Sequence, residues 1–141
     1  AVLNAQGGLW IDAATTCRQR LDVWLNRRQP LVLLRRAHQQ HPKVWNGFIH
    51  AAAPGHPLLL AAWQRMASAL LARSGERVYR DFGPGLLRDL LAAGASEAGL
   101  QVLQEQDVQA QLQIGSSSDV LPGEQHWSKR QQTESLYLSG G

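Results

Sequence analysis

The sequence predicts a mixed α/β domain, and two kinds of pattern carry that prediction. Short apolar runs of strand length occur at Trp10–Ile11, Leu31–Leu34 and Phe48–Ala53. Apolar residues at helical spacing follow Pro57 and Pro84. With 141 residues, 44% of them hydrophobic, the chain is long and apolar enough to bury the core of one domain. The pattern therefore favours strands and helices packed as layers.

The first third of the chain is expected to alternate between helix and strand. A helix over residues 1–6, capped by Gly7, precedes the first strand. The small residues of Ala13–Cys17 predict a loop. Arg18–Arg28 is expected to be helical because its apolar residues recur at i, i+3 and i+4. Pro30 ends that helix and leads into the second strand.

The clearest helix begins at Pro57 and extends to Arg73. We expect it to pack on strands near Trp10 and Phe48, with His56 making a structural hydrogen bond at its start. Its apolar stripe is interpreted as core and consists of Leu59, Trp63, Met66 and Leu70.

The remaining elements are shorter. Val78–Tyr79 predicts a strand, and Gly83-Pro84-Gly85 predicts the start of a helix that ends at Gly94. Two further strands are expected at Leu100–Leu103 and Ala110–Ile114. Gly115–Gly123 is rich in Ser, Gly and Pro and is long enough to be a mobile lid. Residues 139–141 are expected to be a frayed tail, which leaves a domain over 1–138.

Charge and cysteine content narrow the function classes. The net charge of +3 is too small, and the aromatic residues too rarely interleaved with basic ones, for a nucleic-acid binder. The pairs Arg27-Arg28 and Arg35-Arg36 are interpreted as solvated; the alternative is attraction to a nucleotide diphosphate or to anionic lipid headgroups. Cys17 has no cysteine to pair with, so a cytoplasmic location, peripheral to the membrane at most, is expected. No apolar run has the length of a spanning helix.

The segment Gly7–Ala13, with the sequence Gly-Gly-Leu-Trp-Ile-Asp-Ala, combines three features of a ligand site. The glycine pair allows close approach of a ligand to the backbone. Trp10 and Ile11 form a short strand, and Asp12 stands at its end. A carboxylate there suits a sugar hydroxyl or a metal. The alternative is that Asp12 caps the following turn.

Three segments in order resemble the DXD-motif glycosyltransferase family. Gly-Gly-x-Trp-x-Asp is similar to the family's Gly-Gly-x-Tyr/Trp-x-Asp-x-Asp signature, Ala53–Pro57 to the segment before a long helix, and Phe82–Leu87 to a Gly-Pro-Gly helix start. The family includes the yeast Golgi initiating mannosyltransferase and bacterial capsular polysaccharide synthesis proteins. The resemblance implies a GT-A, Rossmann-like fold. It also implies nucleotide-binding units ahead of Gly7, so the chain is expected to be the C-terminal part of such a domain.

The resemblance also assigns roles to residues. Asp12 matches the first Asp of the motif and is the expected catalytic residue, contacting the donor and a divalent metal (Mn or Mg). Position 14 holds Ala where the motif has its second Asp, so His126 is the further metal ligand expected. The expected donor-binding residues are Gly7, Gly8, Trp10, Asp12, Asn46, Trp127, Lys129 and Arg130. For Asn46 a simple turn role is equally open.

The function expected from the resemblance is glycosyl transfer. A hexosyltransferase of this class moves a sugar from a nucleotide-sugar donor to a glycan or polysaccharide acceptor, with retention of configuration. The alternative is a truncated, non-catalytic remnant that serves as a binding or interaction module. Ala14 and the absence of the family's first units from this sequence favour that alternative.

Overall fold

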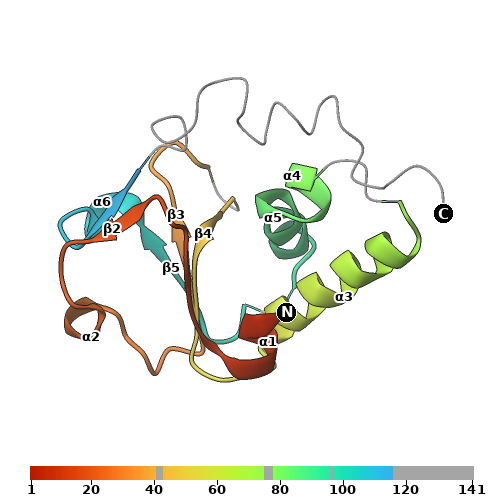
Figure 1. The fold of residues 1–141 in the computed structure, drawn as a ribbon, viewed down its shortest axis with the longest axis horizontal. Coiled ribbons are helices and arrows are strands. Elements are labelled where there is room, and N and C mark those ends of the chain that lie inside the picture. Colours follow the sequence, from red (N-terminus) through yellow and green to blue (C-terminus); the bar gives the residue numbers. More distant parts are fainter. Residues whose placement is uncertain (41–42, 75–77, 96, 116–141) are drawn as a thin grey trace.

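The computed structural model describes residues 1–40, 43–74, 78–95 and 97–115 as a mixed sheet with flanking helices (Figure 1). Its helices are α1 (Val2–Gln6), α2 (Leu21–Trp24), α3 (Pro57–Leu71), α4 (Val78–Asp81), α5 (Pro84–Ala92) and α6 (Glu105–Val108). Its strands are β1 (Gly8–Ile11), β2 (Thr15–Cys17), β3 (Leu31–Arg35), β4 (Trp45–Ala51), β5 (Leu100–Gln104) and β6 (Leu112–Ile114). The predicted α/β class is thereby confirmed.

Four strands form the main sheet in the order β1-β4-β3-β5, and β2 and β6 form a separate antiparallel ribbon. Strand β4 is antiparallel to both β1 and β3, whereas β3 and β5 are parallel. Strands β1, β3 and β5 therefore end at the same edge of the sheet, and β4 begins there. Within the described residues, β1 is one of the two outer strands.

Strand β3 lies inside the sheet and is covered on both faces. Its residues Leu31 to Leu34 are 0% exposed, as expected for an apolar run without polar alternation. Because successive side chains point to opposite faces, Leu31 and Leu33 enter one hydrophobic core, and Val32 and Leu34 enter another.

The first core lies between the sheet and the helices α3 and α5 (Figure 1). Pro57 begins α3, and His56 caps it: Nδ1 accepts the N–H of Leu58 at 3.3 Å, so Nε2 carries the proton toward the carbonyl oxygen of Ala98 at 3.3 Å. The expected structural hydrogen bond of His56 is confirmed. The buried helix residues of this core are Leu58, Leu59 and Ala62 of α3 and Leu86, Leu87 and Leu91 of α5.

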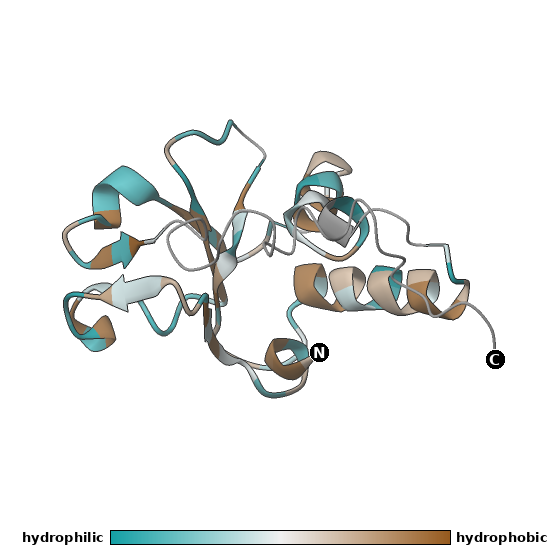
Figure 2. Ribbon diagram, turned by 45° about the horizontal axis from the view of Figure 1, so that its top comes forward, coloured by the Kyte–Doolittle hydropathy of each residue, from teal (hydrophilic) through white to brown (hydrophobic). Residues whose placement is uncertain are grey.

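The packed part of α3 is its N-terminal half. Apolar residues continue along the whole helix, including the part that extends past the sheet (Figure 2). There Leu70 is 47% exposed, and Trp63, near the middle, is 39% exposed. The expectation that this stripe is core is therefore confirmed for Leu59 and Met66. It was wrong for Trp63 and Leu70, because the sheet beneath the helix ends before the stripe does.

The second core lies on the opposite face, between the sheet, α2, α6 and the β2–β6 ribbon (Figure 1). Its buried residues are Leu25, Val32, Leu34, Phe48, Val108 and Leu112. The ring of Trp24 packs at 5.9 Å from that of Phe48, measured between centroids. Phe48 therefore faces away from α3, whereas Ile49 and Ala51 of the same strand face toward it. The expectation that α3 packs on the strand near Phe48 is confirmed.

Three local predictions were wrong. Helix α2 has one turn instead of spanning Arg18–Arg28, because the side chain of Asn26 accepts the N–H of Arg28 at 3.1 Å and turns the chain. The segment Ala13–Cys17 is not a loop throughout, since Thr15–Cys17 pairs with β6. Val78–Tyr79 begins a helical turn, α4, and not a strand.

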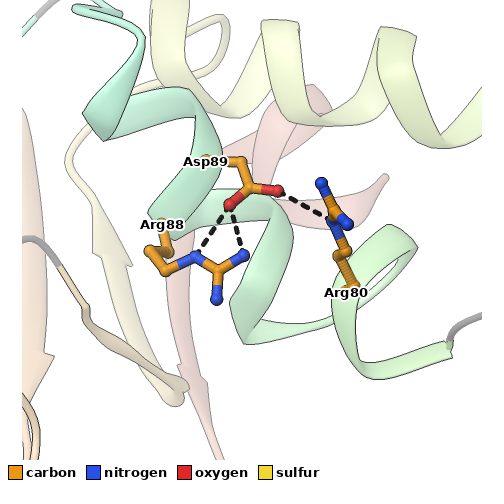
Figure 3. Close-up of polar contacts among 3 residues, drawn as sticks. All are labelled: Arg80, Arg88 and Asp89. Atoms are coloured by element: carbon orange, nitrogen blue, oxygen red, sulfur yellow. Dashed lines mark hydrogen bonds and ion pairs between the residues drawn. The ribbon is translucent and has the colours of Figure 1, made fainter.

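Helix α4 is tied to α5 through Asp89. The carboxylate of Asp89 accepts hydrogen bonds from Arg88 and, at 3.3 Å, from Nε of Arg80 (Figure 3). The guanidinium of Arg88, with a smaller contribution from Arg80, lowers the pKa of Asp89 below its usual value. Asp89 is therefore charged at neutral pH and holds the two helices together.

The uneven packing of α3 predicts unequal costs of truncation. Leu58→Ala should lower the free energy of unfolding by about 2–5 kcal/mol, because Leu58 is fully buried. Trp63→Ala should cost about 1–2 kcal/mol, because much of this side chain already contacts solvent. Urea denaturation of both variants measures the two costs. A cost for Trp63→Ala equal to that for Leu58→Ala would contradict the partial exposure of this side chain.

Candidate functional site

Asp12 directly follows β1 and opens a tight turn into β2. Its N–H donates to the carbonyl oxygen of Gly47 at 2.8 Å, and its own carbonyl oxygen accepts the N–H of Thr15 at 2.9 Å. Its Oδ1 accepts the N–H of Ala14 at 2.9 Å. The carboxylate therefore caps the turn, which was the alternative interpretation of this residue. The side chain is nevertheless exposed, so a ligand has access to it.

The described chain ends beside this turn. Gly115 donates its N–H to the carbonyl oxygen of Ala14 at 2.8 Å, and β6 pairs with β2 just after the turn. The expected lid lies, after Gly115, outside the described residues, and so do the predicted site residues His126, Trp127, Lys129 and Arg130. Their roles stay predictions.

A cavity of about 370 Å³ opens on the face of the sheet that carries α1, α3 and α5. We call it the tryptophan cavity, because Trp10 and Trp63 both line it and are 56% and 39% exposed. Asn46 and Ile49 contribute from β4, with Ile49 directly opposite Trp10 in the strand register. The rest of the wall comes from the start of the chain through Asn4, from Leu59, Ala62 and Met66 of α3, and from Phe82, Gly83, Leu86 and Leu87.

Two amide side chains interrupt the apolar wall of the tryptophan cavity. Asn46 is half-buried at the start of β4. The Oδ1 atom of Asn4 is shielded from solvent and has no hydrogen-bond partner within the described ranges. A mainly apolar wall with a few polar groups and accessible indole rings suits a ligand that has both an apolar face and hydroxyl groups. A sugar ring is such a ligand.

The glycine pair does not act as one unit. Gly7 ends α1 at φ 69°, and a Cβ there would lie 3.0 Å from the carbonyl oxygen of Ala51, so close packing explains this glycine. Gly8 has φ 101° and lines a different cavity, on the other side of the sheet. Among the described residues that were predicted to bind the donor, Trp10 and Asn46 line the same cavity. Asp12 is linked to the neighbour of Asn46 by its hydrogen bond to Gly47, whereas Gly8 lies at the other cavity.

Sequence reasoning did not anticipate a charged cluster at the edge where β3 and β5 end. The guanidinium of Arg36 lies 5.7 Å from the ring centroid of Trp45, and its Nε is 3.8 Å from Oε2 of Glu105. The same Oε2 accepts the N–H of Ala37 at 2.8 Å. Arg36 is therefore partly buried and held in place, not solvated as interpreted. The pair Arg35-Arg36, directly after the apolar run Leu31–Leu34, was the feature of the sequence that could have indicated a charged cluster at this strand end.

The described residues do not fit a metal centre. None of their His, Cys, Asp and Glu side chains form a group of three or more that could hold an ion. Asp12 is the one predicted metal ligand among them, and Ala14 supplies no second carboxylate. Since Mg²⁺ and related ions need several oxygen ligands, a metal site at Asp12 stays a prediction that these residues do not support.

Comparisons with protein families, with curated proteins and with solved structures found no match. Among the described residues, no helix combines the length and apolar character needed to cross a membrane.

The two roles of Asp12 predict different effects of two substitutions. Asp12→Ala removes the acceptor for the N–H of Ala14 and should lower the free energy of unfolding by about 1 kcal/mol. Asp12→Asn keeps an acceptor oxygen and should cost less than about 0.5 kcal/mol. Thermal and urea unfolding give both values. Equal destabilisation by Ala and Asn would show that charge, not the capping bond, stabilises the turn.

Proposed function

We propose that the chain is the C-terminal part of a GT-A-type glycosyltransferase domain. It acts on a nucleotide-sugar donor and a glycan or polysaccharide acceptor, with retention at the transferred sugar. One observation carries the proposal: residues from all three segments that resemble the family, or from the helices they start, line the tryptophan cavity. They are Trp10 from the first, Leu59, Ala62 and Trp63 from the helix after the second, and Phe82, Gly83 and Leu86 from the third.

The sheet supports the same proposal. Ligands of open α/β sheets bind beyond the carboxyl ends of parallel strands. Asp12 follows β1 at that edge, and Asn46 lies near the start of the antiparallel β4 beside it. The hydrogen bond from Asp12 to the carbonyl oxygen of Gly47 couples the two positions.

In this proposal the tryptophan cavity binds the sugar, and the turn at Asp12 positions the donor. The exposed indoles of Trp10 and Trp63 offer flat surfaces for the apolar face of a sugar, and the amide of Asn46 offers hydrogen bonds to its hydroxyls. The carboxylate of Asp12 then fixes a donor hydroxyl. Arg36 lies at the same edge, but its charge is paired with Glu105 and the Trp45 ring beneath it packs against the second core. The diphosphate leaving group is therefore left to the predicted Lys129 and Arg130, outside the described residues.

A second candidate is a sugar-binding module without turnover, the truncated remnant of such an enzyme. The capping bond of Asp12 to Ala14 and the lack of a second carboxylate at position 14 favour it. Both candidates bind a sugar in the tryptophan cavity, so a measurement of donor binding tests what they share. A measurement of donor turnover distinguishes the enzyme from the binding module.

Binding is measured by NMR titration of the 141-residue chain with a panel of UDP- and GDP-sugars, with and without Mn²⁺. The active donor should shift the indole N–H signals of Trp10 and Trp63 and the side-chain amide of Asn46. Asn46→Ala should weaken that binding by about tenfold, the worth of one or two hydrogen bonds. A panel that leaves these three side chains unshifted would overturn the proposal.

Turnover is measured as transfer and as hydrolysis of the same donors. Asp12→Asn should fold normally and reduce turnover by about a hundredfold or more, because a transition-state interaction is lost. Asp107→Asn, an exposed carboxylate on α6, is the matched control and should keep wild-type rates. Wild-type rates in folded Asp12→Asn would remove the catalytic assignment. Donor binding without turnover in the unmodified chain would establish the second candidate.

A further inference from the structure

A second cavity, of about 450 Å³, lies on the opposite face of the β1–β4 pair from the tryptophan cavity. In the strand register Leu9 pairs with His50, and both line this second cavity, whereas the next pair, Trp10 and Ile49, lines the tryptophan cavity. The segment from Arg20 through α2 to Arg27 forms its outer wall. The two cavities share no lining residue, so we treat the second, here called the arginine cavity, as a separate site.

The charges of the arginine cavity are partly compensated. Arg20 forms a bidentate pair with Asp22, with Nη2 to Oδ2 at 2.7 Å and Nε to Oδ1 at 3.1 Å. Arg27 lines the same cavity, and its guanidinium makes no hydrogen bond or ion pair within the described part of the chain. The lining therefore carries one uncompensated positive charge, next to a carboxylate that can accept from a hydroxyl group.

His50 forms the floor of the arginine cavity. It is 6% exposed, and its Nδ1 is shielded from solvent without a partner among the described residues. A buried polar atom in that state is costly, and a ligand that hydrogen-bonds the ring removes the cost. Burial and, to a smaller extent, the charge of Arg27 lower the pKa of His50. The imidazole is therefore neutral at neutral pH and can either donate or accept.

We propose that the arginine cavity binds a small hydroxylated organic anion of the sugar-phosphate class. The anionic group lies against the guanidinium of Arg27, and hydroxyl groups meet His50 and Asp22. The volume is within the range of small-molecule sites, and the net charge of the lining favours an anion over a neutral sugar. This site does not depend on the proposed glycosyl transfer, because it lies on the other side of the sheet.

The test is an NMR titration of the full 141-residue chain with glucose 6-phosphate, compared with glucose and with inorganic phosphate. Glucose 6-phosphate should bind saturably and shift the signals of Leu9 and His50. Glucose should not bind, and phosphate should bind more weakly. The pKa of the His50 ring should rise in the complex, because the negative charge of the bound anion offsets the positive charge of Arg27. The Arg20–Asp22 pair has no net charge and should not change this effect.

Arg27→Gln should weaken binding of glucose 6-phosphate by about tenfold or more, the usual worth of a charge-assisted hydrogen bond. Arg28→Gln is the matched control: its side chain is exposed, does not line the cavity and carries the same charge, so binding should change by less than about twofold. Amide spectra confirm that both variants fold. Equal weakening by the two substitutions, shifts confined to the tryptophan cavity, or no saturable binding would each overturn the proposal.

Discussion

Burial of β3 on both faces is the constraint on which the rest of the structure depends. Its four leucine and valine side chains are fully shielded, so a layer must cover each face of the sheet. Helices α3 and α5 supply one layer, and α2, α6 and the β2–β6 ribbon supply the other. Strand β1 lies at one edge of the described sheet. The two cavities lie there, on either side of the β1–β4 pair.

The parts of the fold that the sequence predicted are those with a strong local signal. Leu31–Leu34 is a continuous apolar run, and Pro57 and Pro84 mark the first turns of the two longest helices. The predictions that were wrong concern segments whose structure depends on contacts with residues far away in the sequence. Thr15–Cys17 becomes a strand because β6 is available as a partner, and the apolar spacing around Trp24 serves the second core although the helix there ends after one turn.

The candidate site was predictable in part for the same reason. Trp10, Asp12 and Asn46 could be selected from motifs, and the pairing of β1 with β4 brings them together. The opposite wall, with Trp63 and Phe82, depends on how α3 and α5 cross the sheet, which no local pattern specifies. His50 lies within an apolar strand, and it shares a cavity with Arg27 because the segment from Arg20 to Arg27 folds over that strand, which no local pattern specifies.

The β2–β6 ribbon affects the order in which parts of the chain can fold during synthesis. It joins Thr15, near the start of the chain, to Ile114, at the end of the described part, and Gly115 then bonds to the turn that Asp12 opens. During synthesis Asp12 leaves the ribosome long before β6, so β2 has no partner until almost all of the rest of the described chain has followed. Closing so long a loop is entropically unfavourable and slow. The turn that presents the carboxylate is thus completed late, together with the second core, because Leu112 of β6 is one of that core's buried residues. A chain cut before β6 would lack the ribbon that fastens Asp12.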